Sequence, residues 1–116
     1  MRNLIVLIAF FVYAINNAQD YTILHINSSW NSKNDYKDLY KIKGAKVVKA
    51  LLEDQNASIK NQIKSVPVIF IYKDNSLIGR YDGGISLKIL TPYHEIQDLI
   101  NSSKINYRRQ TTEWER

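Results

Sequence analysis

The sequence of 116 residues contains no cysteine, only two histidines and no glycine-rich loop of the kind that binds phosphate. Without cysteine the chain cannot carry out thiol–disulfide chemistry, form a disulfide or build a thiolate metal site. His25 lies inside an apolar stretch and His94 near the start of an expected helix, so the pair does not predict a metal site. We therefore expect no metal and no cofactor.

The chain also lacks a strong excess of one charge. Its formal net charge is +5 at pH 7, and the basic residues are spread along the sequence. This is too weak a signal to predict nucleic-acid binding. The carboxylates of Glu53-Asp54 and of Asp35 and Asp38 have no convergent partner in the sequence, as acid–base catalysis would need.

No apolar run is long enough to span a bilayer comfortably. The longest, Leu4–Ile15, has 12 residues, whereas a spanning helix needs about 20. With Arg2 before this run and Ala18 after it, residues 1–18 are typical of a cleaved signal peptide. The alternatives are an uncleaved anchor, which would touch a membrane through residues 4–15, and a folded strand. We expect an exported protein, periplasmic or extracellular.

The rest of the chain alternates between strand-like and helix-like patterns. YTILHI and SVPVIFIY are short apolar runs rich in β-branched and aromatic residues, which indicate buried strands. Residues 45–54 fit either a strand or a helix, and Thr91-Pro92 is typical of a helix start. The expected elements are a strand at 21–26, a helix from 34 or 35 to 40 or 42, the ambiguous 45–54, a helix from 56 or 58 to 63, strands at 65–72 and 76–81, and a helix at 92–102.

The last thirteen residues, 104–116, change to a polar and charged composition. We predict a tail that is either disordered or adds an edge strand at Ile105–Tyr107. Tyr107, Arg108, Arg109 and Trp114 mix basic and aromatic character, which suits contact with an acidic partner, a membrane surface or nucleic acid; the alternative is a solvated, mobile terminus. The predicted organisation is thus a signal peptide at 1–18, a domain at 19–103 and this tail.

Residues 64–84, KSVPVIFIYKDNSLIGRYDGG, resemble the C-terminal half of a thioredoxin. That family has a Val- or Ile-Pro pair, an apolar strand, a turn, a return strand and a glycine pair before its last helix. The resemblance extends over about residues 20–102 and implies a cis peptide bond before Pro67. It also favours a strand for 46–53, and hence a minimal thioredoxin-like α/β fold with a central sheet of about four strands and about three helices.

The loop after the first strand, INSSWNSKND, is where the family carries Trp-Cys-Gly-Pro-Cys. Trp30 is present here, but Asn31 and Asn34 stand where the two cysteines would be. Redox activity is therefore excluded. A role like that of a glutathione transferase would need one of Ser28, Ser29 and Ser32 and a large helical domain that the chain lacks. We expect no enzymatic activity.

The resemblance implies one groove, in which an extended peptide pairs with the backbone beside the proline. The candidate binding residues lie in three loops: Trp30, Asn31, Asn34, Val66, Pro67, Gly83 and Gly84. The leading hypothesis is a redox-inactive, thioredoxin-like module that binds a protein or peptide, with Trp30 as the anchor. The alternative for Trp30 is that it only covers the end of the sheet. The alternative function is a small structural or accessory component of a cell envelope or viral assembly, docked through residues 104–116.

Overall fold

The computed structural model describes residues 20–114, with side chains as far as residue 105. Its centre is one mixed sheet of four strands in the order β2-β1-β3-β4. The central strands β1 (Tyr21–Asn27) and β3 (Val68–Lys73) are antiparallel, β2 (Lys46–Leu51) is parallel to β1, and β4 (Ser76–Asp82) is antiparallel to β3. The protein is therefore an α/β protein, and the predicted sheet of four strands is confirmed.

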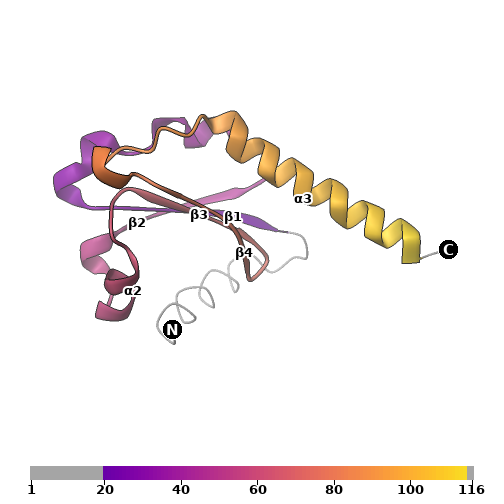
Figure 1. Cartoon of the computed structure of the whole chain (residues 1–116), viewed down its shortest axis with the longest axis horizontal. Coiled ribbons are helices and arrows are strands. Elements are labelled where there is room, and N and C mark those ends of the chain that lie inside the picture. The colour runs from indigo at the N-terminus through magenta and orange to yellow at the C-terminus, as the bar shows by residue number, and fades with distance from the viewer. Residues whose placement is uncertain (1–19, 115–116) are drawn as a thin grey trace.

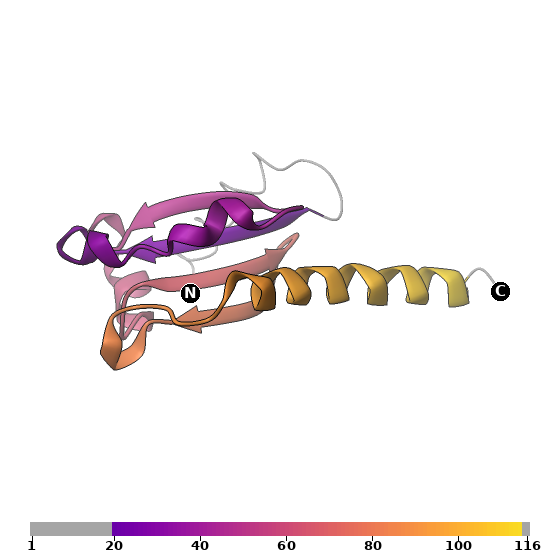
Figure 2. The same ribbon diagram turned by 90° about the horizontal axis from the view of Figure 1, so that it is seen from above.

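Helices cover both faces of this sheet (Figure 1). The 3-10 helix η2 (Lys37–Lys41) and the start of α3 (Tyr93–Trp114) lie over one face, and α2 (Ala57–Gln62) lies over the other (Figure 2). Each face has its own apolar core. The first contains Ile23, Leu39, Ile71, Ile96 and Ile100, and the second contains Leu24, Ile26, Ile59, Val68 and Phe70. This alternation along β1 and β3 follows from the two-residue period of a strand.

The ambiguous stretch 45–54 forms β2 followed by the short 3-10 helix η3 (Leu52–Asp54), so the strand that the resemblance favoured is present. The helix predicted to begin at Asn56 or Ser58 is also present. Asn56 caps α2, and its side-chain oxygen accepts a hydrogen bond from the Ile59 N–H at 3.0 Å. This contact satisfies one of the free backbone donors at the helix start.

The helix predicted between residues 34 and 42 is replaced by two 3-10 helices, η1 (Ser29–Asn34) and η2. A side chain of β1 accounts for the break between them. The Tyr36 N–H donates to Nε2 of the buried His25 at 3.1 Å, so it is not used in a helical turn. In this segment a hydrogen bond to a side chain of the sheet replaces the backbone hydrogen bond that a continuous helix would form.

The edge strand predicted at Ile105–Tyr107 is wrong, because α3 continues without a break to Trp114. Its sequence contains neither proline nor glycine, the usual residues that end a helix. Only its first half packs on the sheet core, through Ile96 and Ile100, and its second half extends past the sheet (Figure 2). The expected signal peptide, residues 1–18, lies outside the described residues. Within residues 20–114, no helix has the length and apolar character needed to cross a membrane.

Candidate functional site

Three loops meet at one end of the sheet because of the strand directions. β1 ends at Asn27 and β2 at Leu51, and these two residues pair in the parallel register. β3 begins at the same end, where Val68 pairs with both Ile26 and Asp82. The loop after β1, the loop before β3 and the loop after β4 are therefore neighbours.

Asn31 is the centre of a buried hydrogen-bond network among these loops. Its side chain amide Nδ2 lies 3.1 Å from Asn27 Oδ1, 3.0 Å from the Leu87 carbonyl and 3.4 Å from the Val66 carbonyl. Its Oδ1 accepts from Asn34 Nδ2 at 2.8 Å. An amide nitrogen has two hydrogens, so the longest of the three contacts is the weakest. One carboxamide thus joins all three loops.

Asn27 extends the hydrogen-bond network to η1 and to Asp35, the residue that follows it. Its Nδ2 donates to the Asn31 carbonyl at 2.9 Å and to Asp35 Oδ1 at 2.6 Å. Both Asn27 and Asn31 are only 2% exposed. Buried polar groups are tolerated when they are hydrogen-bonded, so these residues act as internal structure.

The loop before β3 lies directly under the loop after β4. The Val66–Pro67 peptide bond is cis, as the resemblance implies, and both residues are buried. The Gly83 N–H donates to the Pro67 carbonyl at 2.8 Å. A Cβ at Gly83 would lie 2.8 Å from the Val66 carbonyl oxygen and 2.9 Å from the Lys88 nitrogen. Only glycine fits this close approach.

Large apolar side chains are exposed around this buried centre. Trp30 is 68% exposed and Ile85 103% exposed. Ile85 lies in the 3-10 helix η4 (Gly84–Ser86), which is tied to the loop before β3 by a hydrogen bond of 3.0 Å from the Gly84 N–H to Ser65 Oγ. Trp30 precedes Asn31 directly, so the two apolar side chains belong to adjoining loops.

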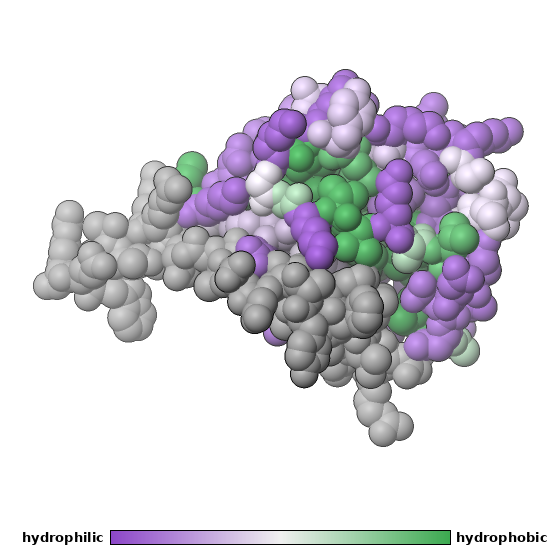
Figure 3. Space-filling model, turned by 180° about the vertical axis from the view of Figure 1, so that it is seen from behind, coloured by the Kyte–Doolittle hydropathy of each residue, from purple (hydrophilic) through white to green (hydrophobic). Residues whose placement is uncertain are grey.

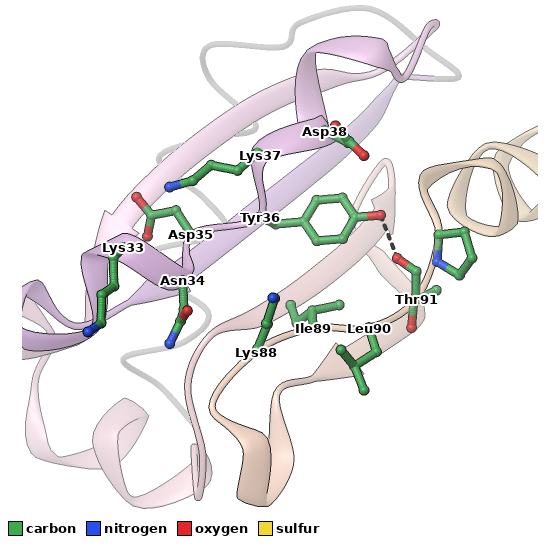
Figure 4. Close-up of a pocket in the computed structure, with 11 residues that line it drawn as sticks. Lys33, Asn34, Asp35, Tyr36, Lys37, Asp38, Lys88, Ile89, Leu90 and Thr91 are labelled. Carbon is green, nitrogen blue, oxygen red and sulfur yellow. Dashed lines mark hydrogen bonds between the residues drawn. The ribbon is translucent and has the colours of Figure 1, made fainter.

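A pocket of about 530 Å³ opens between residues 33–38 and residues 88–92 (Figure 4). Lys88 and Asn34 are directed into the space between these two segments. At the far end, the Tyr36 hydroxyl donates to the Thr91 carbonyl at 2.6 Å. Burial raises the pKa of Tyr36 to about 12. The phenol therefore remains a donor and closes that end of the pocket.

Glu53 holds the loop after β1 from the side of β2. The Ser29 N–H donates to Glu53 Oε2 at 2.9 Å, and the Ser29 hydroxyl donates to the same oxygen. These hydrogen bonds lower the pKa of Glu53 to about 2. The carboxylate thus serves as a fixed acceptor that ties Ser29 to the end of β2.

His25 is buried under the same loop. Desolvation lowers its pKa from 6.5, opposed by the charge of Asp35, while the charge of Lys49 lowers it further. Because its Nε2 accepts the Tyr36 N–H, the ring must be neutral with the proton on Nδ1. Within residues 20–114, no three histidine or acidic side chains are grouped so that they could hold a metal ion.

The structure brings together most of the residues that the sequence suggested for binding. Asn31, Asn34, Val66, Pro67 and Gly83 form the connected centre, with Asn34 half-buried and the others buried. Trp30 and Gly84 are exposed. Tyr107, Arg108, Arg109 and Trp114 lie on the last turns of α3, where side chains are outside the described part of the structure.

The sequence analysis did not identify residues 85–90 as part of the site. Ile85, Leu87 and Lys88 belong to this segment, and all three lie at or beside the site. The available signal was a run of apolar residues, ISLKIL, between a glycine pair and a proline, which is unusual for a solvated loop.

No protein-family model matches the chain, and no curated protein matches it in sequence. Among solved structures, one described as "Structure of a malarial protein" is 22% identical in sequence and has a TM-score of 0.49. The match covers 72% of this chain and 96% of the malarial protein's chain. At this identity and TM-score, the likeness carries neither a family nor a function.

Proposed function

We propose that this chain is a redox-inactive, thioredoxin-like domain that binds a protein or an extended peptide at the end of the sheet containing Trp30 and Pro67. The partner would lie across the loop after β1 and the loop after β4. No chemistry on the partner is part of the proposal.

The topology of the sheet supports the thioredoxin-like part of this proposal. A minimal fold of that kind needs a parallel pair, a third strand antiparallel to the first, and a hairpin to the fourth. The order β2-β1-β3-β4 with these directions is consistent with such a fold. The cover of η2 and α3 on one face and α2 on the other is also consistent with it.

The role of Asn31 supports binding over catalysis. Asn31 and Asn34 occupy the positions at which the family has its cysteines, and the chain has no cysteine elsewhere. The Asn31 carboxamide is fully used in holding three loops together. A side chain in this state has a structural task and no free atom with which to react.

The observation that carries the proposal is the exposure of Trp30 and Ile85 on adjoining loops. A tryptophan 68% exposed and an isoleucine 103% exposed leave apolar surface in water that a partner would cover. Exposed apolar patches mark interaction sites, and tryptophan is frequent among the residues that dominate binding energy. Because Val66 and Pro67 lie beneath the loop after β4, a partner would meet Trp30, Gly84 and Ile85 first.

The test is crosslinking-assisted capture of partners from the native envelope fraction by the tagged protein. Trp30→Ala and Ile85→Ser should each lose the partner. Tyr40→Ala is the matched control, because Tyr40 is an equally exposed aromatic residue on η2, away from the three loops. Loss of the partner with Tyr40→Ala but not with Trp30→Ala would contradict the proposed site, and so would a partner retained by both Trp30→Ala and Ile85→Ser.

A second candidate function is docking through the C-terminal helix as a structural component. It is favoured by one observation, the extension of α3 past the sheet, where no other described element packs on it (Figure 1). Deleting residues 106–116 would abolish capture in this case and leave it intact if Trp30 and Ile85 form the site.

A further inference from the structure

A second surface lies at the opposite side of the molecule from β4, along the outer edge of β2. Among the described residues, β2 pairs only with β1. Alternate backbone N–H and C=O groups of an edge strand point outward and are ready to pair with another chain. Figure 3 views the molecule from this side and shows apolar surface in contact with solvent between hydrophilic side chains.

The side chains of β2 divide between its two faces. Val48 and Ala50 pack on the core beneath α2, so Val47, Lys49 and Leu51 point to the other face. There Val47 is 37% exposed and Leu51 is 40% exposed. The edge thus combines unpaired backbone groups with apolar side chains that are only half covered.

The charges along this edge have one sign. Residues 39–52 contain four lysines, Lys41, Lys43, Lys46 and Lys49, and no acidic residue. Lys41 pairs with Asp38 at 3.5 Å, and within the described part of the chain the other three have no ion-pair partner. A second copy of β2 would oppose lysine with lysine, which is destabilising across paired strands.

The other edge of the sheet is different. In β4, Arg80 pairs with Asp82 at 2.9 Å, and an irregular register between Ile71 and Tyr72 disturbs the pairing with β3. Such irregularities twist an edge and oppose strand addition. The β2 edge has no comparable irregularity in its register with β1.

We propose that the outer edge of β2 accepts an extended, acidic segment of another protein as a fifth strand. Main-chain hydrogen bonds along Lys46–Leu51 would hold the segment, as in other strand-addition complexes. On the face that carries Val47, Lys49 and Leu51, an acidic side chain would face Lys49 and apolar ones would cover Val47 and Leu51. A second acidic side chain would face Lys46 on the opposite face. This site is separate from Trp30 and does not depend on the proposed function.

The test uses a blocked peptide as long as β2 with two glutamates three positions apart, the spacing of Lys46 and Lys49, and valine at the other positions. A second peptide has lysine in place of glutamate. Binding is followed by fluorescence anisotropy and by amide hydrogen exchange of the purified protein. The glutamate peptide should bind and slow the exchange of amides within 46–51, and the lysine peptide should not bind. Lys46→Glu with Lys49→Glu should weaken binding by about tenfold or more.

The control variant is Lys60→Glu with Lys64→Glu, which changes the net charge equally on exposed lysines at α2 and should change affinity by less than about twofold. Trp30→Ala should leave the peptide affinity unchanged. Four outcomes would overturn the proposal: no binding of the glutamate peptide, equal binding of the lysine peptide, equal loss in both double variants, and self-association of the protein through 46–51. Failure of the Trp30 site in the capture experiment would leave this test unaffected.

Discussion

Trp30 and Asn31 are neighbours in the chain, yet their solvent exposure is opposite. Asn31 is 2% exposed and bonded to three loops, whereas Trp30 is 68% exposed and faces solvent. The polar residue is inside and the aromatic one outside, which reverses the usual distribution. Such a reversal indicates that one residue holds the site together and the other is available for contact.

The same division extends through the surrounding residues. His25, Asn27 and Tyr36 belong with Asn31, because each has a hydrogen-bond partner within the loops. Ile85 belongs with Trp30. We call these the inner layer and the outer layer. Changes to the inner layer should alter stability, and changes to the outer layer should alter binding.

The largest effect is expected for Asn31→Leu. The substitution keeps the approximate size but leaves the Leu87 carbonyl, the Asn27 amide oxygen and the Asn34 amide without their partner. Each buried group left unpaired costs about 1–3 kcal/mol. The contacts to Leu87 and Asn34 are only part-buried, so water can replace some of what they lose, and the free energy of unfolding should fall by about 2–4 kcal/mol. Urea denaturation followed by tryptophan fluorescence measures this. A fall below about 0.5 kcal/mol would show that Asn31 does not hold the loops together.

The next largest effect is a dependence on pH from His25. Its pKa is lowered in the folded state, so the unfolded chain binds the proton more readily. The contribution of neutral His25 is therefore complete above about pH 6.5 and decreases as the pH falls below that value. Unfolding measured in urea from about pH 7.5 to about pH 5 should show this loss, at up to about 1.4 kcal/mol per pH unit.

Two variants separate His25 from other titrating groups. In His25→Leu, the slope of stability against pH over this range should disappear, even though the variant is less stable overall. In His94→Gln, which changes an exposed histidine, the slope should remain. A slope that disappears only in His94→Gln would refute the assignment.

A smaller effect is expected for Tyr36→Phe. The substitution removes the hydroxyl that donates to the Thr91 carbonyl at the end of the pocket. The free energy of unfolding should fall by about 1 kcal/mol, and amide exchange should become faster in residues 88–92. Tyr40→Phe, on an exposed ring, is the control. Unchanged exchange in residues 88–92 would mean that this hydrogen bond does not hold the segment.

The smallest effect on stability is expected for Trp30→Ala, which acts only on the outer layer. The free energy of unfolding should change by less than about 0.5 kcal/mol, as for other exposed substitutions. Circular dichroism with urea is the suitable measurement, because it does not depend on the tryptophan that is removed. A loss above about 1 kcal/mol would assign Trp30 to the inner layer and to covering the sheet end.

The sheet was the part of the fold that could be predicted from the sequence. The apolar run after Pro67 and the turn at residues 73–76 define β3 and β4 by local pattern alone. The resemblance decided β2, whose helical spacing of valines and leucines is misleading. The start of α2 could be narrowed to Asn56 or Ser58 because the preference of these residue types for a cap position is local, and the structure selects Asn56.

The structure of the segment between β1 and β2 could not be predicted from its local sequence pattern. Its 3-10 form depends on His25 and Asn27, which lie in a strand and hydrogen-bond with residues several positions later. Periodicity within the segment does not contain that information. The sequence indicated which loops meet at this end of the sheet, but it did not indicate which of their side chains are buried. The burial of Val66 and the exposure of Ile85 arise from the contact between the loop after β4 and the loop before β3.

The surroundings of Asn31 also bear on the reactivity of this position. The amide nitrogen is met by oxygens of Asn27, Val66 and Leu87 within 3.4 Å, and all three are acceptors. A sulfur anion placed at the amide nitrogen would face the lone pairs of these three oxygens, whereas the Asn34 amide donates on the other side of the side chain, at Oδ1. Burial would raise the proton affinity of the sulfur further. A cysteine placed at residue 31 is therefore expected to be a protonated, weakly reactive thiol. Three acceptors surround the side chain at this point of the loop, so the loop does not favour a negative charge there.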